Sequence, residues 1–382
     1  MRYNLGEFQP RRSRLAHSIR RIAVNTGGGD APGLNAVIRS IVLSALRRGW
    51  EVLGIRKGYE GLLDTSKIIQ LDRNSVRGIT HLGGTILGTT NRSSPFEYPI
   101  KQADGTTALI DRSEEVVENF KRLQIDGLIA IGGDGSMKIA KGLFEKGLPV
   151  VGVPKTIDND LSGTVVTFGF DTAVTVATDA IDRLHSTAEA HERVFVVEVM
   201  GRYAGWIALH AGVSATADVV LIPEVPFDLG PVCDKIMDRE ARGRRFSIVV
   251  VAEGAKPIDG QMVSADQGAG REVLLGGIAE QVAQGIQERT GKETRTVVLG
   301  HLQRGGSPTT FDRLLALRFG AAAVRMVASE NFGVMVALDP PIVLAVPLEV
   351  ATERMKCVPL DSDTMLTARD LGISFGDEVG EG

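Results

Sequence analysis

The stretch DGLIAIGGDGS, residues 126–136, decides the fold. Its apolar run ends at glycines and an acid, and a segment with helical spacing follows, in which apolar residues recur at Ile139 and Leu143. The same order appears earlier, where the run from Ile22 to Val24 ends at NTGGGD and leads into a helix-like stretch from Leu34 to Arg48. A buried strand, a glycine turn and a helix form the repeating unit of an α/β fold.

Further apolar runs, rich in Val and Ile, end in the same way. They lie at residues 149–154, 194–199, 219–222, 246–251 and 295–299. Runs of this kind, separated by helical segments, are typical of parallel strands buried on both faces. Ligands of such sheets bind beyond the carboxyl ends of the strands, so we expect the polar residues that follow the runs to converge, from two sheets, on one cleft. Residues 61–111 and 257–270 lack clear strands, and we interpret them as loops and peripheral elements.

Composition excludes several classes of protein. The 382 residues are 43% apolar and 24% charged, and no apolar run is long enough to cross a membrane. A net charge of −4 gives no broad positive field for nucleic acid. Two cysteines fit neither a disulfide framework nor a zinc site, so a cytoplasmic setting is expected, with residues 1–20 as a basic, solvated tail. Glycine is in excess, at 45 residues, which indicates bare backbone in many places.

The two glycine loops are candidate phosphate sites. Gly27, Gly28 and Gly29 lie between a strand and a helix, where backbone N–H groups can approach an anion, although a plain tight turn would also explain them. Their spacing fits neither the dinucleotide fingerprint nor the P-loop. In the loop from Gly132 to Ser136, Asp134 would repel phosphates unless a cation intervenes, so it is a candidate Mg²⁺ ligand, with a turn or cap as the alternative. Ser136 is the expected N-cap of the next helix.

The loop KTIDND, residues 155–160, offers two carboxylates beside a lysine. One carboxylate could accept a hydroxyl proton as general base, and the other could tune it or contact the metal. Lys155 could neutralise a transferring phosphate. The alternative is a turn with solvated charges.

Basic side chains gather near strand edges and ends. The group consists of Arg193, Arg202, Arg295, His301 and Arg304. Guanidinium groups bind phosphate with two hydrogen bonds, so several of them together suit a phosphorylated substrate, although each alone is more often a surface ion-pair partner. Glu253, at the end of a strand, could bind a sugar hydroxyl or close a loop.

With these residues assembled, the sequence resembles the phosphofructokinase family, which phosphorylates fructose 6-phosphate at the 1-hydroxyl. The resemblance covers about residues 21–330. It depends on six motifs in order, namely GGDAPGLNAVIR (28–39), GGTILGT (83–89), IGGDGS (131–136), KTIDND (155–160), VVEVMGRYAGW (196–206) and TVVLGHLQRGGSP (296–308).

The resemblance implies roles for individual residues. Asp158 is the implied general base and Asp160 its support, while Lys155, Thr156 and Arg202 surround the transferring phosphoryl group. Asp134 would hold Mg²⁺. The implied ATP-binding residues are Gly28, Gly29, Asn91, Arg92, Gly133, Asp134, Gly135 and Ser136.

The implied substrate site combines residues from several motifs. Met200, Gly201 and Glu253 would contact the sugar, and His301 and Arg304 the 6-phosphate. The set is completed by Thr156, Ile157, Asp158, Arg202, Leu302 and Gln303. Arg193 and Arg295 resemble arginines that reach in from a neighbouring subunit, which implies a homo-oligomer, either a dimer or a tetramer.

The donor is expected to be ATP, with pyrophosphate as the alternative. Gly135 matches ATP-using members, where pyrophosphate users carry Asp, whereas Lys155 matches pyrophosphate users and one branch of ATP users. The loop before Arg92 is one residue longer than in well-studied bacterial members.

The effector pocket of the family matches only in part. Arg39 fits, but Leu43 and His185 stand where those bacterial members have effector-binding arginines, so allosteric control is not carried over.

The expected fold is therefore two Rossmann-like, three-layer α/β domains with mainly parallel sheets and the active site in the cleft between them. Residues 21–168 with about 303–352 would bind the donor and Mg²⁺, and residues 169–302 with about 353–382 the sugar phosphate. Two other classes are more distant alternatives. A dinucleotide-dependent oxidoreductase is disfavoured by the glycine spacing, and a non-catalytic sugar-phosphate sensor by the presence of Asp134, Asp158 and Asp160.

Overall fold

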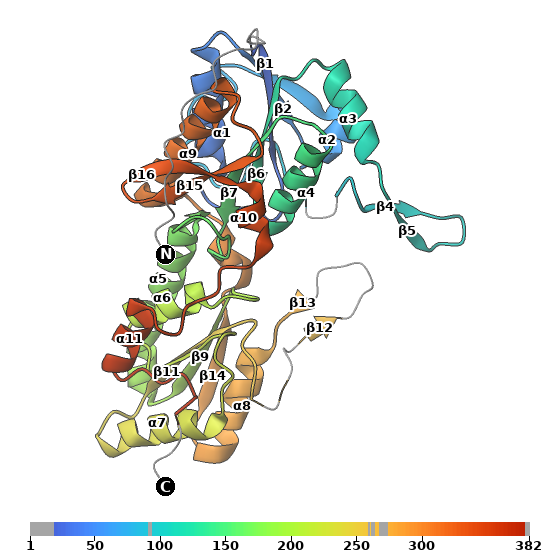
Figure 1. Cartoon of the computed structure of the whole chain (residues 1–382). Helices are drawn as coiled ribbons and strands as arrows, with labels where there is room; N and C mark the ends of the chain where they lie inside the picture. The colour runs from blue at the N-terminus through green and yellow to red at the C-terminus, as the bar shows by residue number, and fades with distance from the viewer. Residues whose placement is uncertain (1–18, 91–93, 259, 261–263, 267–273, 379–382) are drawn as a thin grey trace.

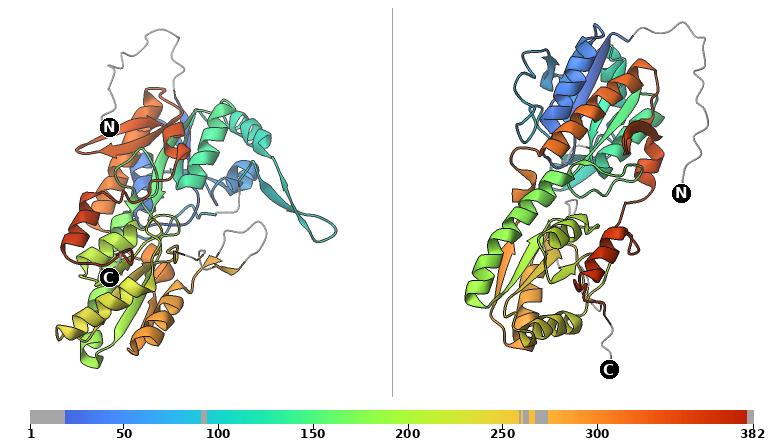
Figure 2. Two further views of the ribbon diagram at one scale, coloured as in Figure 1. Left: turned by 60° about the horizontal axis from the view of Figure 1, so that its bottom comes forward. Right: turned by 90° about the vertical axis from the view of Figure 1, so that its left-hand side faces the viewer.

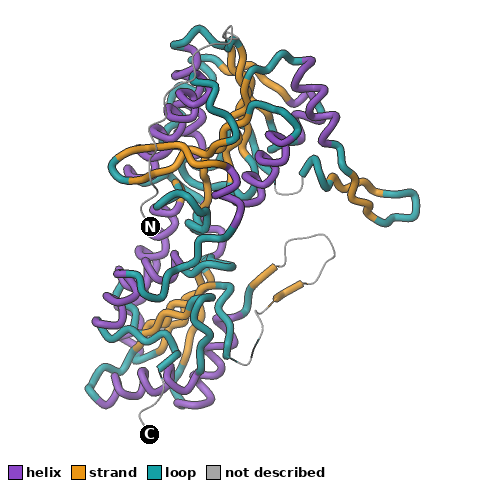
Figure 3. The backbone as a smooth tube through the Cα atoms, in the orientation of Figure 1, coloured by secondary structure: helices purple, strands orange, loops and turns teal. Residues whose placement is uncertain are grey.

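The computed structural model describes residues 19–90, 94–258, 260, 264–266 and 274–378 (Figure 1). The described chain builds two main sheets that lie in its two halves, with helices around each, and two small two-stranded sheets (Figure 1, Figure 3). Within these residues, no helix is both long and apolar enough to cross a membrane.

The first sheet has eight strands in the described part of the chain. Its order is β16-β15-β7-β6-β1-β2-β3, and β8 pairs with β7. The strands are β1 (Arg21–Thr26), β2 (Glu51–Ile55), β3 (Ile68–Leu71), β6 (Gly127–Gly132), β7 (Val150–Thr156), β8 (Phe168–Gly169), β15 (Val334–Asp339) and β16 (Ile342–Pro347). The central pairs are parallel, and only the outer strands β3 and β16 run antiparallel. The runs expected as buried strands are thus confirmed for β1, β6 and β7.

The second sheet has the order β10-β11-β9-β14, and every pair in it is parallel. Its strands are β9 (Val194–Val199), β10 (Val219–Leu221), β11 (Ser247–Ala252) and β14 (Thr294–Val298). Each overlaps an expected strand run, and β9, β10 and β11 are apolar and buried along their length, because strands covered on both faces need apolar residues at successive positions. The edge strand β14 is instead largely exposed.

One expectation about loops is wrong. The stretch 61–111 contains β3, which pairs with β2 and extends the first sheet, and a projecting hairpin of β4 (Tyr98–Lys101) and β5 (Thr107–Ile110) (Figure 1). The stretch 257–270 contains β12 (Ser264–Asp266), which pairs with β13 (Leu274–Leu275). These strands are short and lie at edges, where a continuous apolar run is not required.

Helices cover both faces of each sheet. They are α1 (Leu34–Leu46), α2 (Glu60–Leu63), α3 (Ser113–Arg122), α4 (Asp134–Glu145), α5 (Phe170–His191), α6 (Trp206–Ser214), α7 (Leu229–Ala241), α8 (Ile278–Thr290), α9 (Thr310–Ala328), α10 (Leu348–Glu353) and α11 (Asp363–Asp370), with 3-10 turns η1 (Thr65–Lys67) and η2 (Gly300–Arg304). In β1, Ile22 and Val24 pack with α1 and α9, whereas Ala23 faces α3 and α4. In β9, Val197 faces α5 and α6, and Val196 faces α7 and α8. The predicted three-layer α/β architecture is confirmed.

Three segments connect the two halves. Helix α5 leaves the first sheet at β8 and enters the second half, α9 returns, and residues 354–362 cross again between α10 and α11 (Figure 1, Figure 2). At the first crossing, the buried carboxylate of Asp312 in α9 accepts hydrogen bonds from the backbone N and the Oγ1 of Thr172 in α5, at 2.8 and 2.5 Å. The positions of the domain boundaries stay a prediction.

Candidate active site

The two glycine loops lie next to each other, because they follow the neighbouring strands β1 and β6. The backbone N–H of Gly27 donates to the carbonyl of Ile131 at 2.9 Å, and that of Gly28 to Thr90 at 3.1 Å. Gly28 has a φ of +76°, a left-handed conformation that glycine adopts without strain. Asn91 and Arg92, the other expected donor contacts, lie outside the described residues.

Helix α4 begins at the second glycine loop, and the expected N-cap is wrong. Gly133 occupies that position, and Ser136 lies within the first turn of the helix. Ser136 is buried and lies against the backbone of Gly132, so it fills space beneath the loop instead of capping the helix. The first turn of α4 therefore offers backbone N–H groups and the positive end of the helix dipole to an anion.

Asp134 and Gly135 form the exposed start of α4. The carboxylate of Asp134 is ion-paired with Lys138 at 2.7 Å, one turn along the helix, and its side chain is 31% exposed. A Cβ built on Gly135 would meet no atom within 4 Å. Space is therefore free beside the first turn, where a donor phosphate was expected.

The KTIDND loop follows β7, directly beside the second glycine loop. The backbone N–H of Asp158 donates to the Oγ1 of Thr156 at 3.1 Å, which fixes the turn between them. Burial raises the pKa of the Asp158 carboxyl above its usual range. Burial, together with the charge of Asp158, also raises the pKa of Asp160 to about 6. Carboxylates that lose water in this way accept protons more readily than exposed ones.

Lys155 connects the catalytic loop to the first glycine loop. Its ammonium group is buried and donates a hydrogen bond to the carbonyl of Gly29. Burial and, to a smaller extent, the nearby charge of Arg304 lower the pKa of Lys155 to about 8. A cationic group thus lies between the expected donor site and the catalytic carboxylates.

Arg304 connects the second half of the chain to the residues next to the first glycine loop. It ends η2, and its Nη1 donates to the carbonyl of Asp30 at 3.0 Å. A Cβ on Gly29 would lie 2.9 Å from the same nitrogen, so Arg304 approaches the backbone of the first glycine loop closely. The charge of Arg304 also opposes the rise in the pKa of Asp158.

The expected sugar-binding residues lie at the carboxyl ends of β9 and β11. The backbone N–H of Gly254 donates to Gly201 at 3.1 Å, and a Cβ on Gly254 would lie 1.8 Å from the carbonyl oxygen of Arg202. The two strand ends can approach this closely because position 254 is glycine. Burial raises the pKa of the Glu253 carboxyl, and the charge of Arg202 opposes that rise. Met200 precedes Gly201 and is partly buried.

The residues of η2 divide into buried and exposed positions. Gln303 is fully buried, accepts a hydrogen bond from the backbone of Met200 at 3.4 Å and donates to the carbonyl of Gly300 at 3.1 Å. It therefore holds the turn. His301 and Leu302 are exposed. Ile157, in contrast, is fully buried in the core of the second half, so its side chain anchors the catalytic loop.

Arg193 and Arg295 are not brought to this site. Both pair with Glu293, and the Nε of Arg193 lies 2.7 Å from its carboxylate. They stand at the amino ends of β9 and β14, whereas the expected sugar contacts follow the carboxyl ends. The six residues of β9 span roughly 20 Å, so Arg193 does not reach the site of its own chain. Arg295 is paired with the same glutamate as Arg193, at the amino end of β14.

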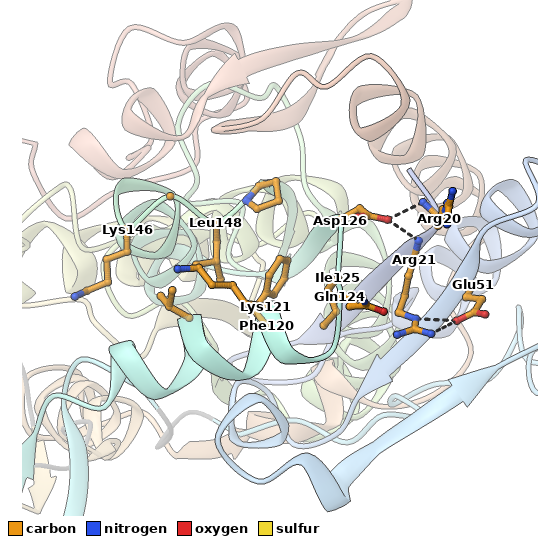
Figure 4. A pocket seen from close by; sticks show the side chains of 13 residues that line it. Arg20, Arg21, Glu51, Phe120, Lys121, Gln124, Ile125, Asp126, Lys146 and Leu148 are labelled. Atoms are coloured by element: carbon orange, nitrogen blue, oxygen red, sulfur yellow. Dashed lines mark hydrogen bonds and ion pairs between the residues drawn. The ribbon is translucent and has the colours of Figure 1, made fainter. Parts of the chain in front are cut away.

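A cavity of about 850 Å³ lies elsewhere, at the amino-terminal edge of the first sheet (Figure 4). Several of its charged groups already have partners. Arg21 contacts Glu51 at 2.7 Å, and Asp126 accepts hydrogen bonds from the backbone N–H groups of Arg20 and Arg21. The predicted phosphate-binding residues gather at the opposite edge, so this cavity is separate from the candidate site.

Glycine loops, half-buried carboxylates and cationic side chains thus lie together at the carboxyl ends of parallel strands of the two sheets, an arrangement that suits phosphoryl transfer. The family model for phosphofructokinase matches residues 21–327. An ATP-dependent 6-phosphofructokinase of Chloroflexus aurantiacus is 51% identical over 365 residues, which are 96% of this chain and 100% of the relative. The chain belongs to the phosphofructokinase family, and the predicted family and phosphotransferase class are confirmed.

Two further similarities bear on donor and architecture. A pyrophosphate–fructose 6-phosphate 1-phosphotransferase of Streptomyces coelicolor is 49% identical over 93% of this chain and 100% of its own length. The solved phosphofructokinase of Saccharomyces cerevisiae superposes with a TM-score of 0.74 at 32% identity, over 87% of this chain. This chain spans about 45% of the yeast chain's length.

Two residues at the site were not predicted. Asn159 lies between the two carboxylates, and Lys356, almost 200 residues later, donates a hydrogen bond to it at 2.9 Å. Asn159 is part of a motif in which only its neighbours were assigned roles, and no local pattern marks Lys356.

Proposed function

We propose that this chain transfers the γ-phosphoryl group of ATP to the 1-hydroxyl of fructose 6-phosphate, giving fructose 1,6-bisphosphate in glycolysis. The observation that carries the proposal is the position of Asp158. Its half-buried carboxylate, with a raised pKa, lies among the charges of Lys155, Arg202 and Arg304, next to both glycine loops. Curated relatives of similar length carry the name of this activity.

In this reaction Asp158 acts as the general base. It accepts the proton of the sugar 1-hydroxyl while the oxygen forms a bond to the γ-phosphorus and the bond from phosphorus to the ADP oxygen breaks. A raised pKa brings the base closer to neutral pH, which makes proton transfer more favourable. The pKa of Asp160 is raised as well, so the two neighbouring carboxylates titrate as a pair.

The cationic groups stabilise the charge of the transferring phosphoryl group. Lys155 reaches the first glycine loop, and Arg202 and Thr156 approach from the ends of β9 and β7. Fixed cations at a site shielded from water lower the transition-state energy more than they would in water. Met200, Gly201 and Glu253 are proposed to contact the sugar, and His301 and Arg304 its 6-phosphate.

A kinase of this family uses a divalent cation with its nucleotide, and we propose Mg²⁺. Among the described residues, no group of three or more His, Cys, Asp or Glu side chains forms a metal site by itself. The residues fit a cation carried mainly by phosphate oxygens, because Asp134 lies at the start of α4 and the buried Oδ1 of Asp160 has no hydrogen-bond partner in the described chain. Asp134 and Asp160 would hold the ion, which would neutralise charge on the β- and γ-phosphates.

ATP is the proposed donor, and pyrophosphate is the second candidate. Gly135 leaves free space beside the first turn of α4, which suits the larger nucleotide. Lys155 supports pyrophosphate, because its ammonium group adds a compact charge beside Gly29. Two relatives from Streptomyces coelicolor, an ATP-dependent and a pyrophosphate-dependent enzyme, are 51% and 49% identical to this chain, so overall identity does not separate the donors.

A homo-oligomer is part of the proposal. Arg193 and Arg295 stand at the amino ends of their strands, close to Glu293 and away from the site of their own chain. They would therefore serve the active site of a neighbouring subunit, in a dimer or a tetramer. The cytoplasmic location expected from the two cysteines also stays a prediction.

Initial rates test this function directly. Purified protein would be assayed with fructose 6-phosphate, Mg²⁺ and either ATP or pyrophosphate, and formation of fructose 1,6-bisphosphate would be measured. We expect turnover with ATP that exceeds turnover with pyrophosphate. A pyrophosphate rate with no ATP rate would overturn the proposed donor.

The proposed base is tested by Asp158→Ser, which should lower kcat at least about 100-fold. Asp104→Ser is the control, because Asp104 is exposed in the turn between β4 and β5. Near-normal turnover of the Asp158 variant would remove the assignment.

A further inference from the structure

The segment of residues 354–362, here called the crossing segment, runs alongside the catalytic loop. Leu161 and Met355 form an antiparallel bridge, and the backbone N–H of Lys356 donates to the carbonyl of Asp160 at 2.8 Å. The Oγ of Ser162 donates to the carbonyl of Arg354 at 2.8 Å. The backbone after Asp158 is thus bound to a part of the chain that lies almost 200 residues later.

The ammonium group of Lys356 is surrounded by oxygens of the same loop. Its Nζ donates to the Oδ1 of Asn159 at 2.9 Å and to the carbonyls of Thr164 and Val165 at 3.1 and 2.8 Å. An ammonium group has three N–H donors, and all three find acceptors here. The indole ring of Trp206 lies 5.4 Å from the Nζ, close enough for a cation–π contact.

Trp206 also holds the backbone of the crossing segment, because its Nε1 donates to the carbonyl of Lys356 at 2.9 Å. Burial lowers the pKa of Lys356 to about 8, while the negative charge of Asp160 opposes that fall. The charge of this lysine is therefore kept out of water at a cost, and its three hydrogen bonds offset that cost.

Asn159 is the element of the catalytic loop through which this lysine can act. It lies between the two carboxylates with a φ of +53°, a left-handed conformation that costs energy for residues other than glycine. Its side chain is buried, and the Oδ1 that accepts from Lys356 also accepts from the backbone N–H of Thr167 at 3.1 Å. Because Asn159 lies between Asp158 and Asp160, its backbone conformation contributes to the direction in which both carboxylates point.

We propose that Lys356 is a positioning residue for phosphoryl transfer, which holds Asn159 in its left-handed turn and so directs the carboxylate of Asp158 at the acceptor hydroxyl. The inference rests on the proposed role of Asp158 as general base. Lys356 does not contact the substrate; it acts through Asn159. A shift of about 1 Å in the position of a reacting group can lower a rate about 100-fold, so loss of this contact should affect turnover.

The test compares kcat and KM in Lys356→Met, which keeps most of the length of the side chain and removes the ammonium group. We expect kcat to fall about 10- to 100-fold, with KM for fructose 6-phosphate and for the phosphoryl donor changed less than about threefold, because the contact orients the base and does not bind substrate. Lys356→Arg, which keeps the charge and the donors, should recover part of the loss. Assays at 15 °C or more below the lowest Tm of the set keep every variant folded.

Asn159→Gly tests the same link from the other side. Glycine can adopt the left-handed turn, but it adopts other conformations as readily, so the turn is no longer held from its side chain, while the two carbonyl contacts of Lys356 stay in place. We expect a fall in kcat at least as large, because this variant loses the hydrogen bond from Thr167 as well as the one from Lys356. The double variant should be no slower than Asn159→Gly, because the contact that Lys356→Met removes is already absent there. Lys235→Met is the matched control: the Nζ of Lys235 donates to the carbonyl of Gly372, in the same C-terminal region but away from the catalytic loop.

Three outcomes would overturn the inference. They are an unchanged kcat in Lys356→Met with a lower Tm, an unchanged kcat in Asn159→Gly, and losses that multiply in the double variant. If Lys356→Met does not fold, Asn159→Gly alone decides, because it leaves the lysine in place. These outcomes can be told apart from failure of the proposed function. If the proposed function is wrong, Asp158→Ser keeps its turnover; if only the inference is wrong, Asp158→Ser still loses turnover.

Discussion

The two glycine loops have similar sequences and lie at the ends of neighbouring strands, but their glycines meet different surroundings. A Cβ on Gly27, in the first loop, would lie 2.4 Å from the Oγ of Ser136. A Cβ on Gly132, in the second loop, would lie 2.3 Å from both the Cβ and the Oγ of the same serine. A Cβ on Gly135, three residues later, would meet nothing within 4 Å.

This difference separates glycines that the fold requires from a glycine that it does not. Gly27 and Gly132 allow the two loops to pack around Ser136, so any chain with this packing needs them. Gly135 lies in the first turn of α4, where glycine is less favourable than alanine by up to about 1 kcal/mol. Packing within the chain therefore does not require glycine at this exposed position, and in the proposed function the free space receives the phosphoryl donor.

The largest expected effect is the loss of stability in Gly132→Ala. The new methyl group would overlap the side chain of Ser136, and the carbonyl of Gly27 lies only 3.1 Å away on the other side. We expect the free energy of unfolding to fall by about 3 kcal/mol, as for other substitutions that overfill a packed site. Unfolding in denaturant would measure it.

Gly133→Ala is the control for that measurement, because its Cβ would approach no atom closer than 3.4 Å. It should cost less than about 1 kcal/mol. An equal loss in both variants would mean that the packing around Ser136 does not distinguish the two glycines.

The next effect is a change of donor in Gly135→Asp. The side chain has room, and a negative charge near the start of a helix is favourable, so the variant should fold with its stability within about 1 kcal/mol of the parent. The carboxylate would occupy the free space and repel donor phosphates. We expect kcat/KM with ATP to fall at least about 100-fold and kcat/KM with pyrophosphate to fall less.

Gly135→Asn separates size from charge in that experiment. If the space matters most, the asparagine variant should lose most of its ATP turnover as well; if charge matters most, it should keep it. Equal losses with ATP and pyrophosphate in Gly135→Asp would contradict the role of Gly135 in donor choice.

Much of the fold could be predicted because its signals are local. A strand covered on both faces must be apolar along its whole length, and a turn into a helix favours glycine, so β1, β6, β7 and β9 were recognisable from short stretches. The candidate residues after these strands could be grouped because parallel strands end at the same edge of a sheet. Edge strands such as β3 carry no such requirement and were missed.

The rest of the site depends on packing between distant segments. Ser136 was expected to cap α4, but it fills the space beneath two glycine loops, one of which lies about 100 residues earlier. The contact of Arg304 with the carbonyl of Asp30 joins the two halves of the chain, and the contact of Lys356 with Asn159 joins the C-terminal region to the catalytic loop. No pattern of nearby residues encodes such pairs.

The smallest expected effect is that of Gly135→Ala. It tests whether packing within the protein leaves position 135 free, as the comparison of the two glycine loops assumes. If packing leaves this position free, a methyl group in the first turn of α4 should raise the free energy of unfolding by about 0.5 kcal/mol, since alanine favours the helix and restricts the unfolded chain. ATP turnover should stay within about threefold of the parent, because a methyl group is smaller and carries no charge. A loss of stability would mean that the position is constrained by the protein after all, which would contradict the premise. A gain in stability with a large loss of ATP turnover would instead mean that the donor lies in van der Waals contact with the α-carbon of Gly135. Glycine at this position would then favour donor binding at the expense of stability.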